Sequence, residues 1–127
     1  MKYVIQTSNG TINPGLLMNV IKNISIIGET EEINVVVFGP AVVALLHHSQ
    51  LKEQLRAVLN DKVNIFVCRN AMDMFELKDG DIPDYAKIVP AGVEKIAKLS
   101  KEGCAYIALI FLITFIKRPG LIVPFDV

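Results

Sequence analysis

The hydrophobic residues of this chain fall into short runs that alternate with amphipathic segments. Runs with the length of a β-strand occupy residues 3–6, 34–38, 63–67 and 86–89. The run at 34–38 is almost continuously apolar, which is typical of a strand that is covered on both faces in a parallel sheet. Alternating strands and helices with short connections predict right-handed βαβ units. We therefore expect an α/β fold, a three-layer α/β/α sandwich with a mostly parallel sheet.

Apolar residues spaced three and four apart predict helices between these strands. The first helix begins with Asn13, a typical N-cap residue, and Pro14 at the first helical position, and it runs to about residue 27, where Gly28 ends it. Polar residues 77–83 predict a turn. Further helices are expected at residues 41–46, 50–59, 69–75 and 90–102.

The carboxyl end is strongly apolar. Residues 104–116 carry no charge, and a second apolar piece follows Pro119 and Gly120. A helix that spans a bilayer needs about twenty apolar residues, so no membrane span is expected. The Ile, Phe, Thr and Tyr content favours a fifth strand, and Pro119 with Gly120 can turn the chain back as a hairpin. Such a hairpin should pack against the domain or a neighbouring subunit. The alternative is a last core strand followed by a tail.

Length and composition indicate one domain over residues 1–127, since no repeat or composition change marks a boundary. Thirteen basic residues balance thirteen acidic ones, and no basic cluster contains interleaved aromatics, so nucleic-acid binding is not expected. Two cysteines are too few for a disulfide framework, and the first residues lack the apolar region of a signal peptide. We expect a cytoplasmic protein. Hydrophobic residues reach 52%, which is high enough to predict a homo-oligomer with an apolar interface.

Cys68 is the main candidate for chemistry. It ends an apolar strand, and Arg69 and Asn70 follow it where a helix begins. A thiol at the start of a helix lies near unpaired N–H groups, which together with the adjacent arginine favour the thiolate. The alternative is that Cys68 only packs, because free cysteine is among the most buried residue types. Cys104 has no basic neighbour and is expected to be a core residue.

Other polar positions lie where open α/β sheets bind ligands, beyond the carboxyl ends of the strands. Gly39 and Pro40 follow the second strand, and Asn9 and Gly10 follow the first. The helix after Gly39 can receive an anion on its N–H groups. Neither a G-x-G-x-x-G motif nor a P-loop lysine is present, so nucleotide binding is weakly supported.

The adjacent residues His47 and His48 point about 100° apart on a helix, so both cannot face one metal ion. His47 can act as an acid or base near the thiol, or it can hydrogen-bond the last carbonyls of a helix. No spacing typical of metal ligands occurs in the sequence. We therefore expect neither a metal nor another cofactor.

Three blocks in this order, at residues 35–46, 66–71 and 89–107, resemble the DsrE/DsrF-like (sulfur-relay, YchN-like) family. The resemblance covers about residues 1–107 and leaves the tail at 108–127 outside it. It implies a compact α/β/α domain with a five-stranded parallel sheet and assembly as trimers or hexamers. It also implies that sulfur is carried as a cysteine persulfide, and it assigns the sulfur-bearing position to Cys68.

Two functions are consistent with the sequence. The first is an intracellular sulfur relay, in which Cys68 takes sulfane sulfur from a donor protein and passes it to an acceptor protein. A persulfide carrier needs a reachable thiolate, nearby N–H donors and no second thiol within reach. The second is an oligomeric binding or scaffold protein without covalent chemistry, in which Cys68 lines a cleft between subunits for a small anionic ligand.

Overall fold

The computed structural model describes residues 1–8, 14–47 and 49–109. Strands and helices alternate along the chain, as the hydrophobic pattern predicts. The elements in order are β1 (Lys2–Thr7), α1 (Pro14–Ser25), β2 (Glu32–Val37), the π-helical turn η1 (Val43–His47), α2 (Ser49–Arg56), β3 (Val63–Cys68), α3 (Arg69–Met74), the 3₁₀ turn η2 (Asp79–Asp81), β4 (Ala86–Val89), α4 (Gly92–Lys101) and β5 (Ala105–Leu109). The predicted N-cap Asn13 and the predicted hairpin lie outside the described residues.

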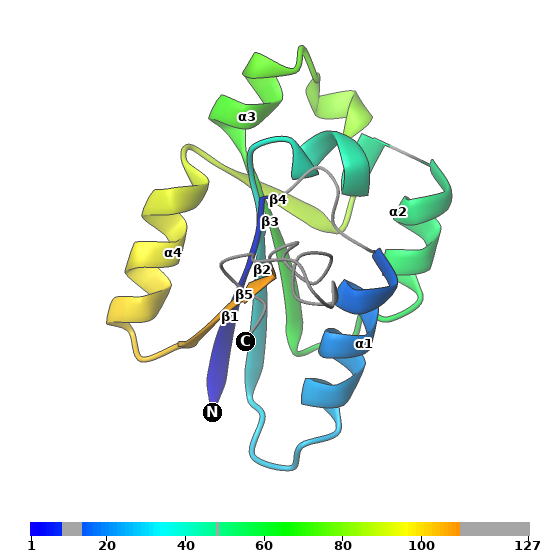
Figure 1. Ribbon diagram of the computed structural model, residues 1–127. Helices are drawn as coiled ribbons and strands as arrows, with labels where there is room; N and C mark the ends of the chain where they lie inside the picture. The colour runs from blue at the N-terminus through cyan, green and yellow to red at the C-terminus, as the bar shows by residue number, and fades with distance from the viewer. Residues whose placement is uncertain (9–13, 48, 110–127) are drawn as a thin grey trace, which may run out of the picture.

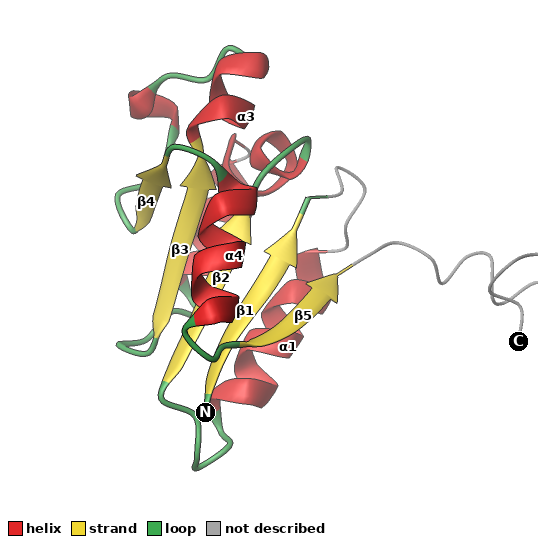
Figure 2. Ribbon diagram, turned by 90° about the vertical axis from the view of Figure 1, so that its left-hand side faces the viewer, coloured by secondary structure: helices red, strands yellow, loops and turns green. Residues whose placement is uncertain are grey.

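The five strands of the described residues form one sheet in the order β4-β3-β2-β1-β5, and every neighbouring pair is parallel (Figure 2). The expected α/β class with a parallel sheet is therefore confirmed. β2 lies at the centre, and its last five residues are buried, which explains why its sequence is almost continuously apolar. The chain reaches β4 at one edge of the sheet and then crosses to β5 at the opposite edge.

Helices cover both faces of the sheet. α1 and α2 lie on one face and α4 on the other, while α3 lies beyond the carboxyl end of β3 (Figure 1). The larger core fills the side of α1 and α2. The smaller core, on the side of α4, contains Val4, Val36, Phe66, Leu99 and Cys104. Because α4 runs back across β3, β2 and β1, its amino end lies at the carboxyl edge of the sheet, where ligands bind in open α/β folds.

The end of α1 differs from the prediction. The helix ends at Ser25, and Gly28 has no positive φ, so Gly28 is not the stop that the sequence suggested. The hydroxyl of Thr30 instead donates a hydrogen bond of 2.8 Å to the carbonyl of Ile24. The same carbonyl also accepts the N–H of Ile27 at 3.1 Å, so it is satisfied without a left-handed glycine.

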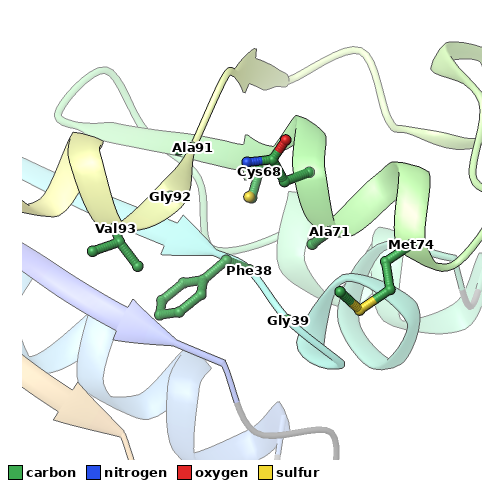
Figure 3. A pocket seen from close by; sticks show the side chains of 9 residues that line it. Phe38, Gly39, Cys68, Ala71, Met74, Ala91, Gly92 and Val93 are labelled. Atoms are coloured by element: carbon green, nitrogen blue, oxygen red, sulfur yellow. The ribbon is translucent and has the colours of Figure 1, made fainter.

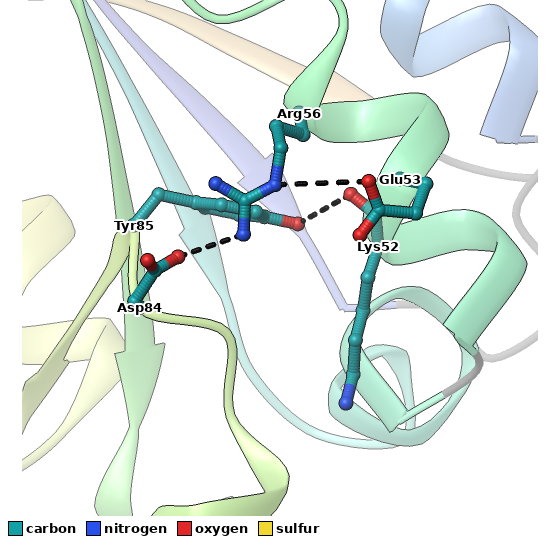
Figure 4. A network of polar contacts seen from close by, with 5 residues as sticks. All are labelled: Lys52, Glu53, Arg56, Asp84 and Tyr85. Atoms are coloured by element: carbon teal, nitrogen blue, oxygen red, sulfur yellow. Dashed lines mark hydrogen bonds and ion pairs between the residues drawn. The ribbon is translucent and has the colours of Figure 1, made fainter.

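A polar cluster joins α2 to the residues before β4 (Figure 4). Arg56 donates to Asp84 Oδ1 at 2.7 Å, and its guanidinium carbon lies 5.0 Å from the centre of the Tyr85 ring. The Tyr85 hydroxyl donates to the Lys52 carbonyl at 3.0 Å. The charged partners are exposed, so the ion pair itself contributes little. The aromatic ring between helix and strand makes the larger contribution to this contact.

The ionisation of Tyr85 gives a testable pH dependence. Burial raises the pKa of Tyr85 from 10.0 to about 12, because the half-buried phenolate loses solvation. The folded chain therefore keeps this proton at a pH where the unfolded chain loses it, and the free energy of unfolding should fall between pH 10 and 12. Urea unfolding across this range measures the effect. Tyr85→Phe is the control, and an identical fall in that variant would assign the pH dependence to other groups.

Candidate functional site

A cavity of about 350 Å³ opens at the carboxyl edge of the sheet, beside the amino end of α4 (Figure 3). The ends of β2 and β3, the helix α3 and the start of α4 form its walls. It is lined by Phe38 and Gly39 after β2, Cys68 at the end of β3, Asn70, Ala71 and Met74 of α3, and Ala91, Gly92 and Val93 at the start of α4. None of these described lining residues is charged, so the cavity is apolar except for one amide, one thiol and backbone groups.

Cys68 supplies the thiol of this cavity. It is the last residue of β3 and the N-cap residue of α3, with the extended backbone angles φ −76° and ψ 120°. Only 6% of its surface is exposed, and its side chain makes no capping hydrogen bond. In Figure 3 its sulfur points toward the space between Phe38, Gly92 and Ala71. The thiol is therefore enclosed: Cys68 belongs to the larger hydrophobic core and also lines the cavity.

The amino end of α4 provides backbone N–H groups at the same cavity. Ala91 is its N-cap residue and offers no side-chain hydrogen bond. The first N–H group paired in this helix is that of Lys95, which donates to the Ala91 carbonyl at 3.1 Å. The N–H groups of Gly92, Val93 and Glu94 precede that bond and carry the positive end of the helix dipole. Together they favour a negative charge in the cavity.

Gly92 allows α4 to approach β2 closely. A Cβ atom at this position would lie 2.8 Å from Phe38 Cβ and 3.1 Å from Phe38 Cγ, well inside the optimal contact distance of about 3.5–4.0 Å between carbon atoms. The Phe38 side chain therefore packs directly on the backbone at the start of α4. A residue without a side chain at position 92 is what lets the start of α4 come this close to the end of β2.

The structure places the other predicted site residues in different surroundings. Gly39 and Asn70 line the cavity with Cys68. Gly39 has a φ of +58°, which favours glycine. Pro40 is exposed and does not line the cavity; its carbonyl accepts N–H bonds from the start of η1. His47 is the last residue of η1. Asn9 and Gly10 lie outside the described residues.

Arg69 points to a different partner from the one that the sequence suggested. Its Nη1 donates to Asp79 Oδ1 at 2.7 Å, and the residue is not part of the cavity lining. The hydrogen bond and the charge of Arg69 hold the pKa of Asp79 below its usual value. The positive charge next to Cys68 in the sequence is therefore compensated by a carboxylate ten residues further along.

Cys104 lies at the other end of the sheet, as a core residue, as expected. Its thiol is buried, and Asn34 Nδ2 lies 3.9 Å from its sulfur. Burial raises the pKa of Cys104, and the carboxylates of Glu32 and Glu102 act in the same direction. Asn34 is paired in register with Asn64, four residues before Cys68, which corresponds to about 13 Å of strand. The two thiols are too far apart to form a disulfide.

Sequence reasoning named three of the nine described residues that line this cavity and missed the other six. Phe38 and Met74 looked like ordinary apolar residues of a strand end and a helix. Ala91, Gly92 and Val93 belonged to a recognised block, but nothing in that block shows which strand the following helix covers. The signal was the glycine next to the helix start, because a glycine at the first helical position marks a close approach of backbone to another group.

The comparison with known sequences decides the family. Residues 1–109 match the sequence model of the DsrE/DsrF-like family. The chain belongs to this family. No sequence among the curated proteins matches it. Cys68 and the other described residues that line the cavity all lie within the matched residues of this DsrE/DsrF-like protein.

Two solved structures have a similar fold. One is a protein of unknown function, MTH1491 from Methanobacterium thermoautotrophicum, with a TM-score of 0.71 and 23% identity over 84% of this chain and 95% of that chain. The other is a conserved protein of unknown function, BT1422 from Bacteroides thetaiotaomicron, with a TM-score of 0.70 and 15% identity over 84% of this chain and 93% of that chain. At these identities the likeness shows the shared α/β fold.

No helix in the described ranges is long and apolar enough to cross a membrane. No group of three or more His, Cys, Asp or Glu side chains in that part of this DsrE/DsrF-like chain is arranged to hold a metal ion.

Proposed function

We propose that this DsrE/DsrF-like protein carries sulfane sulfur as a persulfide on Cys68, as one step of a sulfur relay. The observation that carries the proposal is the position of Cys68, whose thiol faces a cavity with no charged side chain among its described lining residues, beside the first N–H groups of α4, which precede the hydrogen bonds of the helix itself. Membership of the family supports a role in sulfur relay. The proposal also includes a cytoplasmic location and assembly as a homo-oligomer.

The arrangement suits the chemistry of sulfur transfer. The Cys68 thiolate attacks the sulfane sulfur of a donor persulfide, and a new S–S bond forms while the donor's S–S bond breaks. The electron pair leaves with the donor thiolate, so the step needs no oxidant. The product is an anion once its proton is lost, and the N–H groups of Gly92 and Val93 favour that charge. A second thiol within reach could attack the persulfide, form a disulfide with Cys68 and expel the outer sulfur. Cys104 is too distant to do this.

A loading experiment tests the proposal. The reduced protein is incubated with a persulfide donor, and intact-mass and peptide mass spectrometry locate any adduct. We expect one added sulfur atom on Cys68, removed by a thiol reductant, in the wild type and in Cys104→Ser, and none in Cys68→Ser. The Cys104→Ser variant is the matched control, because it removes a buried thiol of the same chain.

Either of two results would contradict persulfide carrying. One is a wild-type protein that stays unmodified, and the other is an adduct that persists in Cys68→Ser. The first result would favour a binding or scaffold protein, in which Cys68→Ser keeps both ligand binding and assembly.

A further inference from the structure

The walls of the Cys68 cavity restrict which sulfur donors can reach the thiol. The described residues that line it carry no charged side chain, and Asn70 contributes the one amide. Met74 and Val93, on either side of Cys68, are exposed by 75% and 65% and present apolar atoms at the mouth. The thiol itself is 6% exposed. A donor must therefore pass apolar side chains and leave water before its sulfur meets the thiol.

Resting on the proposed function, we infer that the donor that loads Cys68 is an inorganic polysulfide, and not the persulfide of a charged small thiol such as glutathione. A polysulfide is an unbranched chain of polarisable sulfur atoms, which contacts apolar walls well along its length. Its negative end can lie against the N–H groups of Gly92 and Val93. The apolar walls of the cavity thus suit the sulfur chain of this ion, and the N–H groups suit its negative end.

Glutathione persulfide fits the same cavity poorly. It carries two carboxylates and one ammonium group close to its sulfur, and the sulfur can reach Cys68 only if part of that peptide enters the mouth. Removing a charged group from water is costly unless an opposite charge pairs with it. The described lining offers no such partner, and the nearest arginine in the sequence, Arg69, is bonded to Asp79.

The loading step balances without a further reagent. The Cys68 thiolate attacks the terminal S–H sulfur of the hydrogen tetrasulfide anion, and the adjacent S–S bond breaks. The electron pair leaves with a trisulfide dianion, and the persulfide on Cys68 keeps the proton until it is lost to water. One sulfane sulfur moves, no net oxidation occurs, and the charge is the same on both sides.

The test compares two donors on one protein. Reduced wild-type protein is treated with sodium tetrasulfide or with glutathione persulfide at equal sulfane sulfur, and the rate of adduct formation on Cys68 is followed by mass spectrometry. The same rates on urea-unfolded protein give the intrinsic reactivity of each donor. After this correction we expect tetrasulfide to load folded Cys68 at least about tenfold faster, because the charge of the polysulfide can lie against the N–H groups of α4, whereas the charged groups of the peptide donor find no partner among the described lining residues.

The outcomes separate this inference from the proposed function. Equal corrected rates, or faster loading by glutathione persulfide, overturn the polysulfide inference and leave the persulfide carrier intact. The absence of an adduct on folded Cys68 with both donors overturns the proposed function and the inference together. A preference for tetrasulfide that is larger on the folded protein than on the unfolded chain supports the cavity as its cause.

Discussion

Replacing Gly92 with alanine is expected to destabilise the fold and to slow sulfur loading of Cys68. The new Cβ would lie 2.8 Å from Phe38 Cβ, an atom fixed to the backbone at the end of β2, so the start of α4 has to move. Overpacking of this kind costs about 1–3 kcal/mol. Urea unfolding measures the loss of stability, and the rate of persulfide formation measures the effect on the cavity.

Gly28→Ala is the matched control. A Cβ at Gly28 would meet no atom within 4 Å, and the residue has no positive φ. Alanine there should leave loading unchanged and should be neutral or stabilising by up to about 1 kcal/mol, because it restricts the unfolded chain. For Gly92→Ala, a protein that is as stable as the wild type and loads as fast would contradict the prediction. Alanine is a better helix former than glycine, so helix propensity alone favours that result. It would show that close packing on Phe38 does not shape this cavity.

The sequence predicted the strands well because each is a short apolar run. The strand at residues 86–89 has the predicted bounds, and Cys68 stands where expected, at the junction of β3 and α3. Hydrophobic pattern alone determines which segments are buried, and in a sheet covered on both faces nearly every residue of a strand is buried. For this reason the position of the thiol was predictable without the fold.

The second half of the site was not predictable because it depends on strand order. The chain crosses from β4 at one edge of the sheet to β5 at the other, and this crossing carries α4 over β3 and brings Gly92 to Cys68. Local sequence does not encode which strands are neighbours. The same limitation applies to Arg69, whose neighbour in sequence is Cys68 but whose partner in space is Asp79.

Met72→Ala is expected to have the largest effect on stability among substitutions near the cavity. α3 has six residues, too few to be stable by itself, so tertiary contacts must hold it. Met72 is 0% exposed, and its carbonyl accepts the N–H of Leu77 at 2.8 Å. Truncation of a fully buried methionine costs about 2–5 kcal/mol. Urea unfolding should show this loss, and loading of Cys68 should become slower because α3 forms one wall.

Met74→Ala is the matched comparison, the same change two residues further along the same helix. Met74 is 75% exposed at the mouth of the cavity, so the free energy of unfolding should change by less than about 0.5 kcal/mol. A wider mouth should leave Cys68 at least as easy to load as in the wild type. If the two variants unfolded at the same urea concentration, burial of Met72 would not be what anchors α3, and the wall beside Cys68 would depend on the contacts of Ala71 instead.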